Sequence, residues 1–188
     1  MSKGIVFFDI DGTLCRYAQR VDEAVKQSFR RFHENGNVAF LCTGRSPIDI
    51  QPDIWELGFD GMIGLMGAYI VVKNQVVQNV TIPRELVKES VDTLLSGKAQ
   101  AYFLGRKIYA RTKYAQDFNI GVPVVHEYHD LCAEGEPPEL SSFDLDFDKV
   151  EDIEPFLEVL GKHSEFLQYD GHTGQTRVLG VNKSSAIE

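Results

Sequence analysis

The sequence predicts an α/β fold in which a parallel-sheet core is interrupted by a second, α+β domain. From the N-terminus to Leu65, short apolar runs alternate with helical periodicities, which is typical of a parallel sheet. Beyond Gly67, strand-like runs follow one another through short turns, which indicates antiparallel pairing. The composition, 43% hydrophobic and 25% charged over 188 residues, is that of a globular chain long enough for one domain plus an insert.

The core begins with the apolar run Ile5–Phe8, which predicts a strand buried on both faces. An amphipathic helix follows and ends at Asn35-Gly36, since both residues tolerate the left-handed conformation. Its apolar positions are three, four and seven residues apart: Val21, Ala24, Val25, Phe29 and Phe32.

The run Val38–Cys42 predicts a second buried strand, and Thr43-Gly44-Arg45 comes directly after it. We expect a helix from Pro47 to Leu57, with the proline in its first turn, and then a short strand from Met62 to Leu65. Short connections between apolar strands predict a parallel sheet with helices on both of its faces.

The second block predicts a hairpin, two helices and further strands. The hairpin joins Ala68–Val72 to Gln75–Val80 through Lys73-Asn74. Helices are expected at Pro83–Leu95 and Ile153–Leu160, and strands at Ala101–Leu104, Lys107–Arg111, Ser142–Phe147, Phe166–Tyr169 and Arg177–Val181. We therefore assign residues 1–80 and 177–188 to a discontinuous core and residues 81–176 to an inserted α+β domain.

The net charge of -9 gives the chain no general attraction for nucleic acid or for anionic membranes. Its three cysteines, Cys15, Cys42 and Cys132, are too few and too widely spaced for a disulfide framework. No leader-like segment precedes the first strand, and no apolar run has the length of a membrane span. We expect a cytoplasmic protein without a nucleic-acid or membrane partner; the oligomeric state is not readable from the sequence.

Asp9-Ile10-Asp11-Gly12-Thr13 is the most informative segment for chemistry. The first strand delivers Asp9 to the carboxyl end of a parallel sheet, where ligands bind in open α/β folds. One carboxylate there can attack phosphorus, while a second protonates the leaving group and later activates water. Magnesium favours oxygen ligands and would offset repulsion between carboxylate and phosphate. The alternative is a helix cap or a solvated loop.

Three motifs resemble those of the haloacid dehalogenase-like superfamily, in its Cof-like branch. They are Phe8-Asp9-Ile10-Asp11-Gly12-Thr13-Leu14, Leu41-Cys42-Thr43-Gly44-Arg45 and Gly180-Val181-Asn182-Lys183-Ser184-Ser185-Ala186. The resemblance covers essentially the whole chain in order. It implies a Rossmann-like core, with the inserted block standing where that branch carries its type IIB cap.

The resemblance also implies roles for individual residues. The catalytic set would be Asp9, Asp11, Thr43 and Lys183, and Mg²⁺ would bind Asp9 and Asp11. Substrate-binding positions would be Gly12, Thr13, Gly44, Arg45, Gly67 and Ala68. From the residues alone, a hydroxyl at a strand end or a lysine near a phosphate suits this chemistry. Alternatives are a capping threonine for Thr43 and an exposed lysine for Lys183, and we assign Arg45 no catalytic role.

Two features depart from the family pattern. Met66 stands before Gly67-Ala68 where the branch commonly has asparagine, so only backbone amides of those two residues could contact phosphate. A fourth, acidic motif with metal ligands should follow Lys183 after a helix and a strand, whereas the sequence stops at Glu188. We expect a core that is incomplete at its C-terminal end and a fragment of a longer protein; the alternative is a natural variant with an impaired metal site.

The motifs predict a magnesium-dependent phosphatase that hydrolyses a small phosphorylated metabolite, such as a sugar phosphate, through an aspartyl-phosphate. One alternative is a phosphotransferase or phosphomutase with the same nucleophile. Another is a non-catalytic phosphate-binding module, because the acidic loop is absent. A cysteine phosphatase fits poorly, since Arg45 lies too close to Cys42 in sequence. The physiological substrate is not readable from the sequence.

Overall fold

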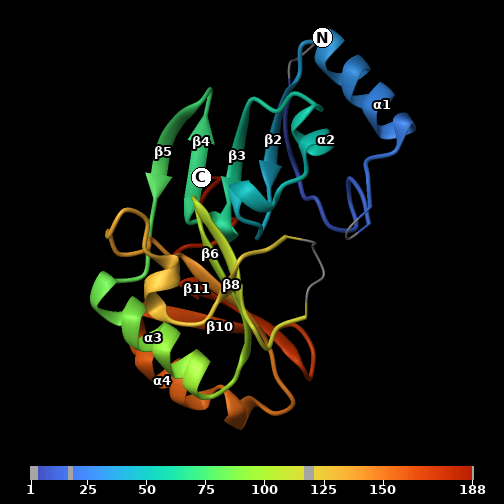
Figure 1. The fold of residues 1–188 in the computed structure, drawn as a ribbon. Coiled ribbons are helices and arrows are strands. Elements are labelled where there is room, and N and C mark those ends of the chain that lie inside the picture. Colours follow the sequence, from blue (N-terminus) through green and yellow to red (C-terminus); the bar gives the residue numbers. More distant parts are fainter. Residues whose placement is uncertain (1–3, 17–18, 117–120, 188) are drawn as a thin grey trace. The chain divides into compact units, whose positions relative to one another are not determined.

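A computed structural model describes residues 4–16, 19–116 and 121–187. The chain divides into two compact units (Figure 1). Unit 1 contains Met1–Asn79 and Asn182–Glu188, and unit 2 contains Val80–Val181. Each unit has its own sheet, which confirms the predicted α/β class with a second, mixed α and β block.

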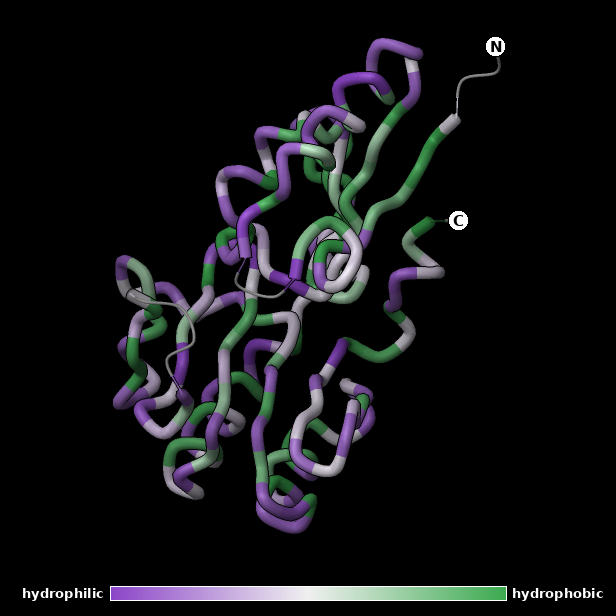
Figure 2. The backbone as a smooth tube through the Cα atoms, turned by 90° about the vertical axis from the view of Figure 1, so that its right-hand side faces the viewer, coloured by the Kyte–Doolittle hydropathy of each residue, from purple (hydrophilic) through white to green (hydrophobic). Residues whose placement is uncertain are grey.

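Unit 1 is built on a five-stranded sheet of order β1-β2-β3-β4-β5. Its strands are β1 (Ile5–Phe8), β2 (Val38–Cys42), β3 (Gly61–Gly64), β4 (Tyr69–Val72) and β5 (Gln75–Asn79). Its helices are α1 (Glu23–Glu34) and α2 (Pro52–Trp55), with 3₁₀ turns η1 (Pro47–Asp49) and η2 (Leu65–Gly67). The first three strands pair in parallel and β4–β5 is the predicted antiparallel hairpin. In Figure 2, β1, which follows closely after the N-terminus, is coloured as a hydrophobic segment.

Both helices of unit 1 pack on one face of the sheet, so the expectation of helices on both faces is wrong for the described residues. Phe29 of α1 and Ile54 of α2 join Ala39, Leu41 and Met62 in a single buried cluster. The reason is the strand order. Strands β1, β2 and β3 lie side by side in sequence order, and right-handed crossovers that advance in one direction all fall on the same side.

Two further local expectations need correction. The first strand is not buried on both faces, because Ile5 is 63% exposed and Val6 is 37% exposed. The expected helix from Pro47 to Leu57 is two short pieces, η1 and α2. Proline at position 52 lacks an N–H and disfavours helical geometry in the residue before it, so the first piece ends and α2 begins anew at Pro52.

Unit 2 contains a six-stranded sheet of order β10-β11-β9-β6-β7-β8. The strands are β6 (Gln100–Gly105), β7 (Ile108–Thr112), β8 (Val124–Val125), β9 (Ser142–Asp146), β10 (Ser164–Gln168) and β11 (Thr173–Val178). The helices are α3 (Arg84–Ser96) and α4 (Glu154–Leu160), with 3₁₀ turns η3 (Tyr128–Leu131), η4 (Val150–Asp152) and η5 (Gly161–His163). Its core packs Phe103 and Phe143 of the sheet against Val91 of α3 and Phe156 of α4.

The last strand begins four residues earlier than the sequence predicts. Strand β11 begins at Thr173, and its end pairs with β10, where Arg177 lies opposite Glu165 and Val178 opposite Ser164. The chain therefore returns to unit 1 at Asn182, whereas the sequence placed that return at residue 177. None of the helices formed by the described residues has the length and apolar content that crossing a bilayer requires.

Candidate active site in unit 1

The Asp9–Asp11 segment lies directly after β1 and turns sharply. Ile10 is fully buried, and its carbonyl oxygen accepts hydrogen bonds from the amides of Leu14 (3.0 Å) and Cys15 (3.3 Å). Gly12 donates its amide to the Cys15 carbonyl at 2.9 Å and has a φ of +77°, a conformation that glycine adopts without steric cost. The buried Ile10 thus anchors a turn on which Asp9 and Asp11 retain side chains that are 41% and 40% exposed.

Lys183 contacts Asp9 although 174 residues separate them in sequence: its Nζ donates to Asp9 Oδ1 at 2.9 Å. The lysine stands in a turn that Asn182 and Ser185 close, where Asn182 Oδ1 accepts the Ser185 amide at 2.9 Å and Ser185 Oγ accepts the Asn182 amide at 3.1 Å. These local bonds hold the backbone that carries the ammonium group. The structure thus brings together two residues that sequence reasoning paired only through a family resemblance.

Thr43 lies at the end of β2, the parallel neighbour of β1. The register Phe8↔Leu41 places Asp9 and Thr43 at the same edge of the sheet. Thr43 is buried, and its Oγ1 accepts the amide of Arg45 at 3.2 Å. That contact uses an oxygen lone pair and not the hydroxyl hydrogen, so a capping bond and donation to a phosphoryl oxygen are compatible.

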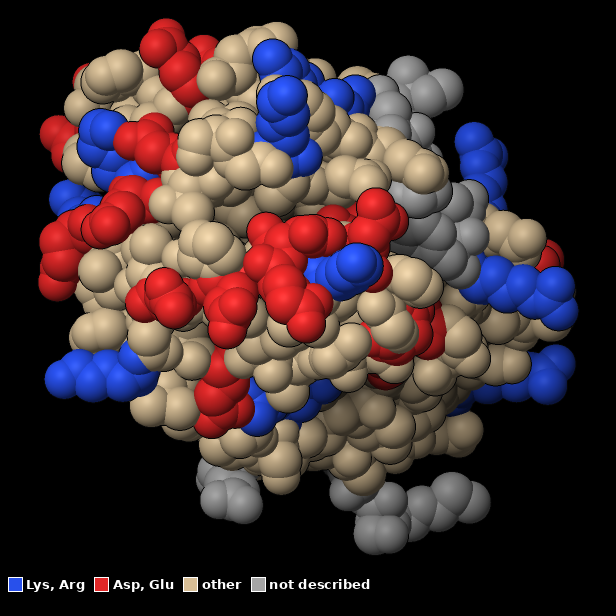
Figure 3. Space-filling view, turned by 90° about the horizontal axis from the view of Figure 1, so that it is seen from below, with Lys and Arg blue, Asp and Glu red and all other residues tan. Residues whose placement is uncertain are grey.

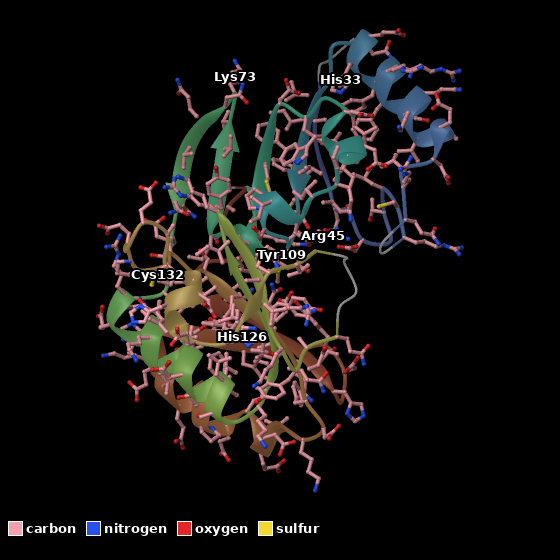
Figure 4. The ribbon with its side chains drawn as sticks, viewed as in Figure 1. His33, Arg45, Lys73, Tyr109, His126 and Cys132 are labelled. Carbon is pink, nitrogen blue, oxygen red and sulfur yellow. The ribbon has the colours of Figure 1, made fainter. Side chains whose placement is uncertain are left out.

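Arg45 pairs with Asp11, a contact that sequence reasoning missed. Nη2 donates to Asp11 Oδ1 at 2.6 Å and Nε donates to Oδ2 at 3.0 Å, which is a bidentate fork. The guanidinium is only 7% exposed, so water competes weakly for it. Figure 4 shows Arg45 beyond the end of β2. Substrate binding by Arg45 stays a prediction, as do the substrate contacts of Gly12, Thr13 and Gly44.

The opposite side of Arg45 contacts the segment between η1 and α2. Nη1 donates to Gln51 Oε1 at 3.1 Å and to the Asp49 carbonyl at 3.5 Å, and the Asp49 carboxylate lies 3.9 Å away. Burial raises the pKa of Asp49 to about 6, against the opposing effect of Arg45. The four-residue spacing of Arg45 and Asp49 was available in the sequence, but Arg45 lies before the expected helix and before η1, so the spacing did not indicate a shared helix face.

The loop after β3 packs against the Lys183 turn. Leu65, Met66 and Gly67 all have positive φ, of 51°, 58° and 102°. Gln78 Nε2 donates to the Gly67 carbonyl at 2.9 Å, and the Ala68 amide donates to the Leu65 carbonyl at 3.1 Å. A phosphate contact by the Ala68 amide would therefore have to replace that bond. The side chain at position 66 supplies no asparagine-like amide.

Gly67→Ala is expected to displace the Lys183 turn. An added Cβ would lie 2.4 Å from the carbonyl oxygen of Asn182, and the φ of +102° is itself strained for alanine. We expect urea unfolding to show a loss of about 2 kcal/mol or more, with a matching loss of any activity that uses Lys183.

Gly135→Ala is the matched control. Gly135 has a φ of +80°, but an added Cβ there would meet nothing within 4 Å. Its cost should be that of the backbone conformation alone, about 1 kcal/mol. Equal losses for the two variants would contradict the close packing of Gly67 on Asn182.

Comparison with known proteins places the chain in a family. Residues 6–172 match the family model described as haloacid dehalogenase-like hydrolase. A Bacillus subtilis (strain 168) protein named "Putative phosphatase YkrA" is 28% identical over 104 residues, which is 55% of this chain. The match spans about 40% of the length of that curated relative.

Solved structures share the fold over nearly the whole chain. The HAD subclass IIB sugar phosphatase BT4131 is 22% identical with a TM-score of 0.74, covering 99% of this chain and 74% of that one. BT1666 from Bacteroides thetaiotaomicron is 20% identical with a TM-score of 0.71, covering 100% and 70%. TM0651 from Thermotoga maritima is 17% identical with a TM-score of 0.72, covering 100% and 73%. Because the family model matches residues 6–172, which is most of the sequence, the chain belongs to the haloacid dehalogenase-like hydrolases.

Proposed function

We propose that this protein is a magnesium-dependent phosphatase that hydrolyses a small phosphorylated metabolite. The observation that carries the proposal is the 2.9 Å contact between Lys183 Nζ and Asp9 Oδ1. A nucleophilic carboxylate with an ammonium group beside it suits attack on an anionic phosphate. Family membership and the phosphatase names of relatives support the same chemistry.

In this mechanism Asp9 attacks phosphorus and the bond to the leaving oxygen breaks. Asp11 gives a proton to that oxygen and later takes one from the water that hydrolyses the aspartyl-phosphate. Lys183 and Thr43 bind phosphoryl oxygens, and Arg45 holds the Asp11 carboxyl in one orientation through its bidentate contact. Proton and phosphoryl group thus each have a named donor and acceptor.

The chain's own donors fit magnesium. Among the residues that the structure describes, no three His, Cys, Asp or Glu side chains gather as a metal site. Asp9 is half exposed and accepts from Lys183 through Oδ1, so its Oδ2 could bind Mg²⁺, which commonly takes one or two carboxylates together with waters and substrate phosphate oxygens. Both carboxylate oxygens of Asp11 accept from Arg45, so the Asp11 carboxylate could bind the metal only by giving up part of that contact. When bound, Mg²⁺ would offset the repulsion between the Asp9 carboxylate and the phosphate.

A thiol nucleophile is the weaker choice. Burial raises the pKa of the Cys42 thiol and outweighs the opposing charge of Lys183. A protonated, buried thiol is a poor nucleophile, whereas Asp9 is half exposed next to a lysine.

The expected partner is a small molecule. The formal net charge of -9 gives no overall attraction for nucleic acid, and Figure 3 shows acidic side chains gathered on the face that it displays. A relative described as a sugar phosphatase favours a sugar phosphate as the first substrate to test. A cytoplasmic location stays part of this proposal.

The test is phosphate release from p-nitrophenyl phosphate and from a panel of phosphorylated sugars, with Mg²⁺ and after treatment with EDTA. We expect turnover with Mg²⁺, a loss of at least about 100-fold after chelation, and recovery when Mg²⁺ is added back. Isomerised product without released phosphate would indicate a phosphotransferase. Binding of phosphate esters without turnover would leave only a binding module, and release that ignores chelation would contradict the metal requirement.

A further inference from the structure

The guanidinium of Arg45 is held from two sides. Nε and Nη2 contact Asp11, and Nη1 contacts Gln51 Oε1 at 3.1 Å on the other side. Arginine has a long, flexible side chain, and its planar fork orients a carboxylate only when the plane itself is held. The contact of Nη1 with Gln51 is therefore as relevant to the orientation of Asp11 as the fork itself.

The segment that carries Gln51 is anchored in the core of unit 1. Pro47 begins η1 and Pro52 begins α2, and the ring of each proline restrains its own φ. Ile50 and Ile54, on either side of Gln51, are buried in the core of unit 1. A side chain mounted between two buried anchors has little freedom to follow Arg45 if the guanidinium moves.

Gln51 differs in kind from the neighbouring acceptor Asp49. The Asp49 carboxylate lies 3.9 Å from Nη1, beyond hydrogen-bond distance, and would compete with Asp11 for the positive charge. The amide oxygen of Gln51 is a neutral acceptor within hydrogen-bond distance. It fixes the plane of the guanidinium without placing a second negative charge beside Asp11.

Building on the proposed function, we propose that Gln51 is a positioning residue for Asp11 that acts through Arg45. Nothing in the family motifs includes this position. The consequence is that proton transfer to the leaving group depends on a side chain that does not itself contact the reacting carboxylate.

The first experiment compares two variants of Gln51 in the full chain. Gln51→Leu has a similar size but no acceptor, and we expect kcat to fall about tenfold with KM changed by less than about twofold. Gln51→Glu keeps an acceptor oxygen but adds a negative charge that competes with Asp11 for the guanidinium, so it should recover only part of the rate. Gln75→Leu, at an exposed position on β5, is the matched control and should behave as the wild type.

The decisive step repeats Gln51→Leu in an Arg45→Met background. If Gln51 acts through Arg45, the second substitution should add less than about twofold to the loss. A full tenfold additional loss would overturn the proposal, because Gln51 would then act by another route. An unchanged kcat in the single variant would overturn it too.

A third measurement does not depend on turnover, so it separates this proposal from the proposed function. The energetic coupling of Arg45 and Asp11 is measured by urea unfolding in a double-mutant cycle with Arg45→Met and Asp11→Asn. The cycle is then repeated with Gln51→Leu, or with the shorter Gln51→Asn if leucine impairs folding. We expect the coupling to fall by about half or more; an unchanged coupling would overturn the positioning role even if the protein proved to be no phosphatase.

Discussion

Asp9→Asn is expected to abolish phosphate release, with kcat falling by about four orders of magnitude or more. An amide oxygen is not a nucleophile, so no aspartyl-phosphate can form, whereas a merely electrostatic role for Asp9 would leave substantial turnover. The measurement is released phosphate under saturating substrate and Mg²⁺, with Asp9→Ala alongside it to exclude activity regained by deamidation.

The control for Asp9 is Asp22→Asn, which makes the same chemical change at an exposed aspartate whose side chain makes no cap hydrogen bond. That variant should retain wild-type kcat. If Asp9→Asn kept even a few per cent of the activity, the nucleophile would have to be sought elsewhere in the chain.

Lys183→Met is expected to lower kcat/KM by about 100- to 1,000-fold while leaving folding nearly unchanged. The lost ammonium group both stabilises negative charge on the phosphoryl group and holds Asp9 at 2.9 Å. The side chains of Lys183 and Asp9 are 35% and 41% exposed, and an ion pair so accessible to water contributes less than about 1 kcal/mol to stability. Lys183→Met should therefore lower kcat/KM strongly and leave the free energy of unfolding almost unchanged.

The matched control is Lys162→Met, at an exposed lysine outside unit 1, which should alter neither quantity. The pair of measurements distinguishes two roles for Lys183. A large loss of stability with a proportionate loss of activity would mean that the lysine holds the turn at Asn182 in place and has no direct part in phosphate binding.

Gly67, in the loop after β3, packs closely on Asn182, the residue before Lys183. The Gly67→Ala and Lys183→Met variants can therefore be compared directly. Gly67→Ala acts on the backbone that carries Lys183, and Lys183→Met removes only the charged group. If Lys183 binds phosphate, both substitutions should lower activity, but only Gly67→Ala should also lower stability. The departure at Met66 matters less in this arrangement, because the loop contributes through its backbone shape.

Local sequence patterns predicted most of the elements and indicated the candidate reacting groups. Apolar runs predicted β1 to β3 within a residue or so, since a short run of branched and aromatic residues suits a buried strand irrespective of its neighbours. Asp9 and Asp11 could be proposed as the reacting groups because the turn that joins them to β1 is encoded in adjacent residues, with Gly12 in the left-handed conformation.

Tertiary structure alone decided which side chains meet. The Lys183–Asp9 contact spans 174 residues, and the Arg45–Asp11 fork spans 34, so neither follows from local periodicity. Strand order placed both helices on one face, and this outcome depends on crossover direction instead of residue type. The sequence alone indicated Asp9 and Asp11 as candidate reacting groups. The side chains that contact each carboxylate, Lys183 and Arg45, are brought there by the packing of β2, the Gln51 segment and the Asn182 turn.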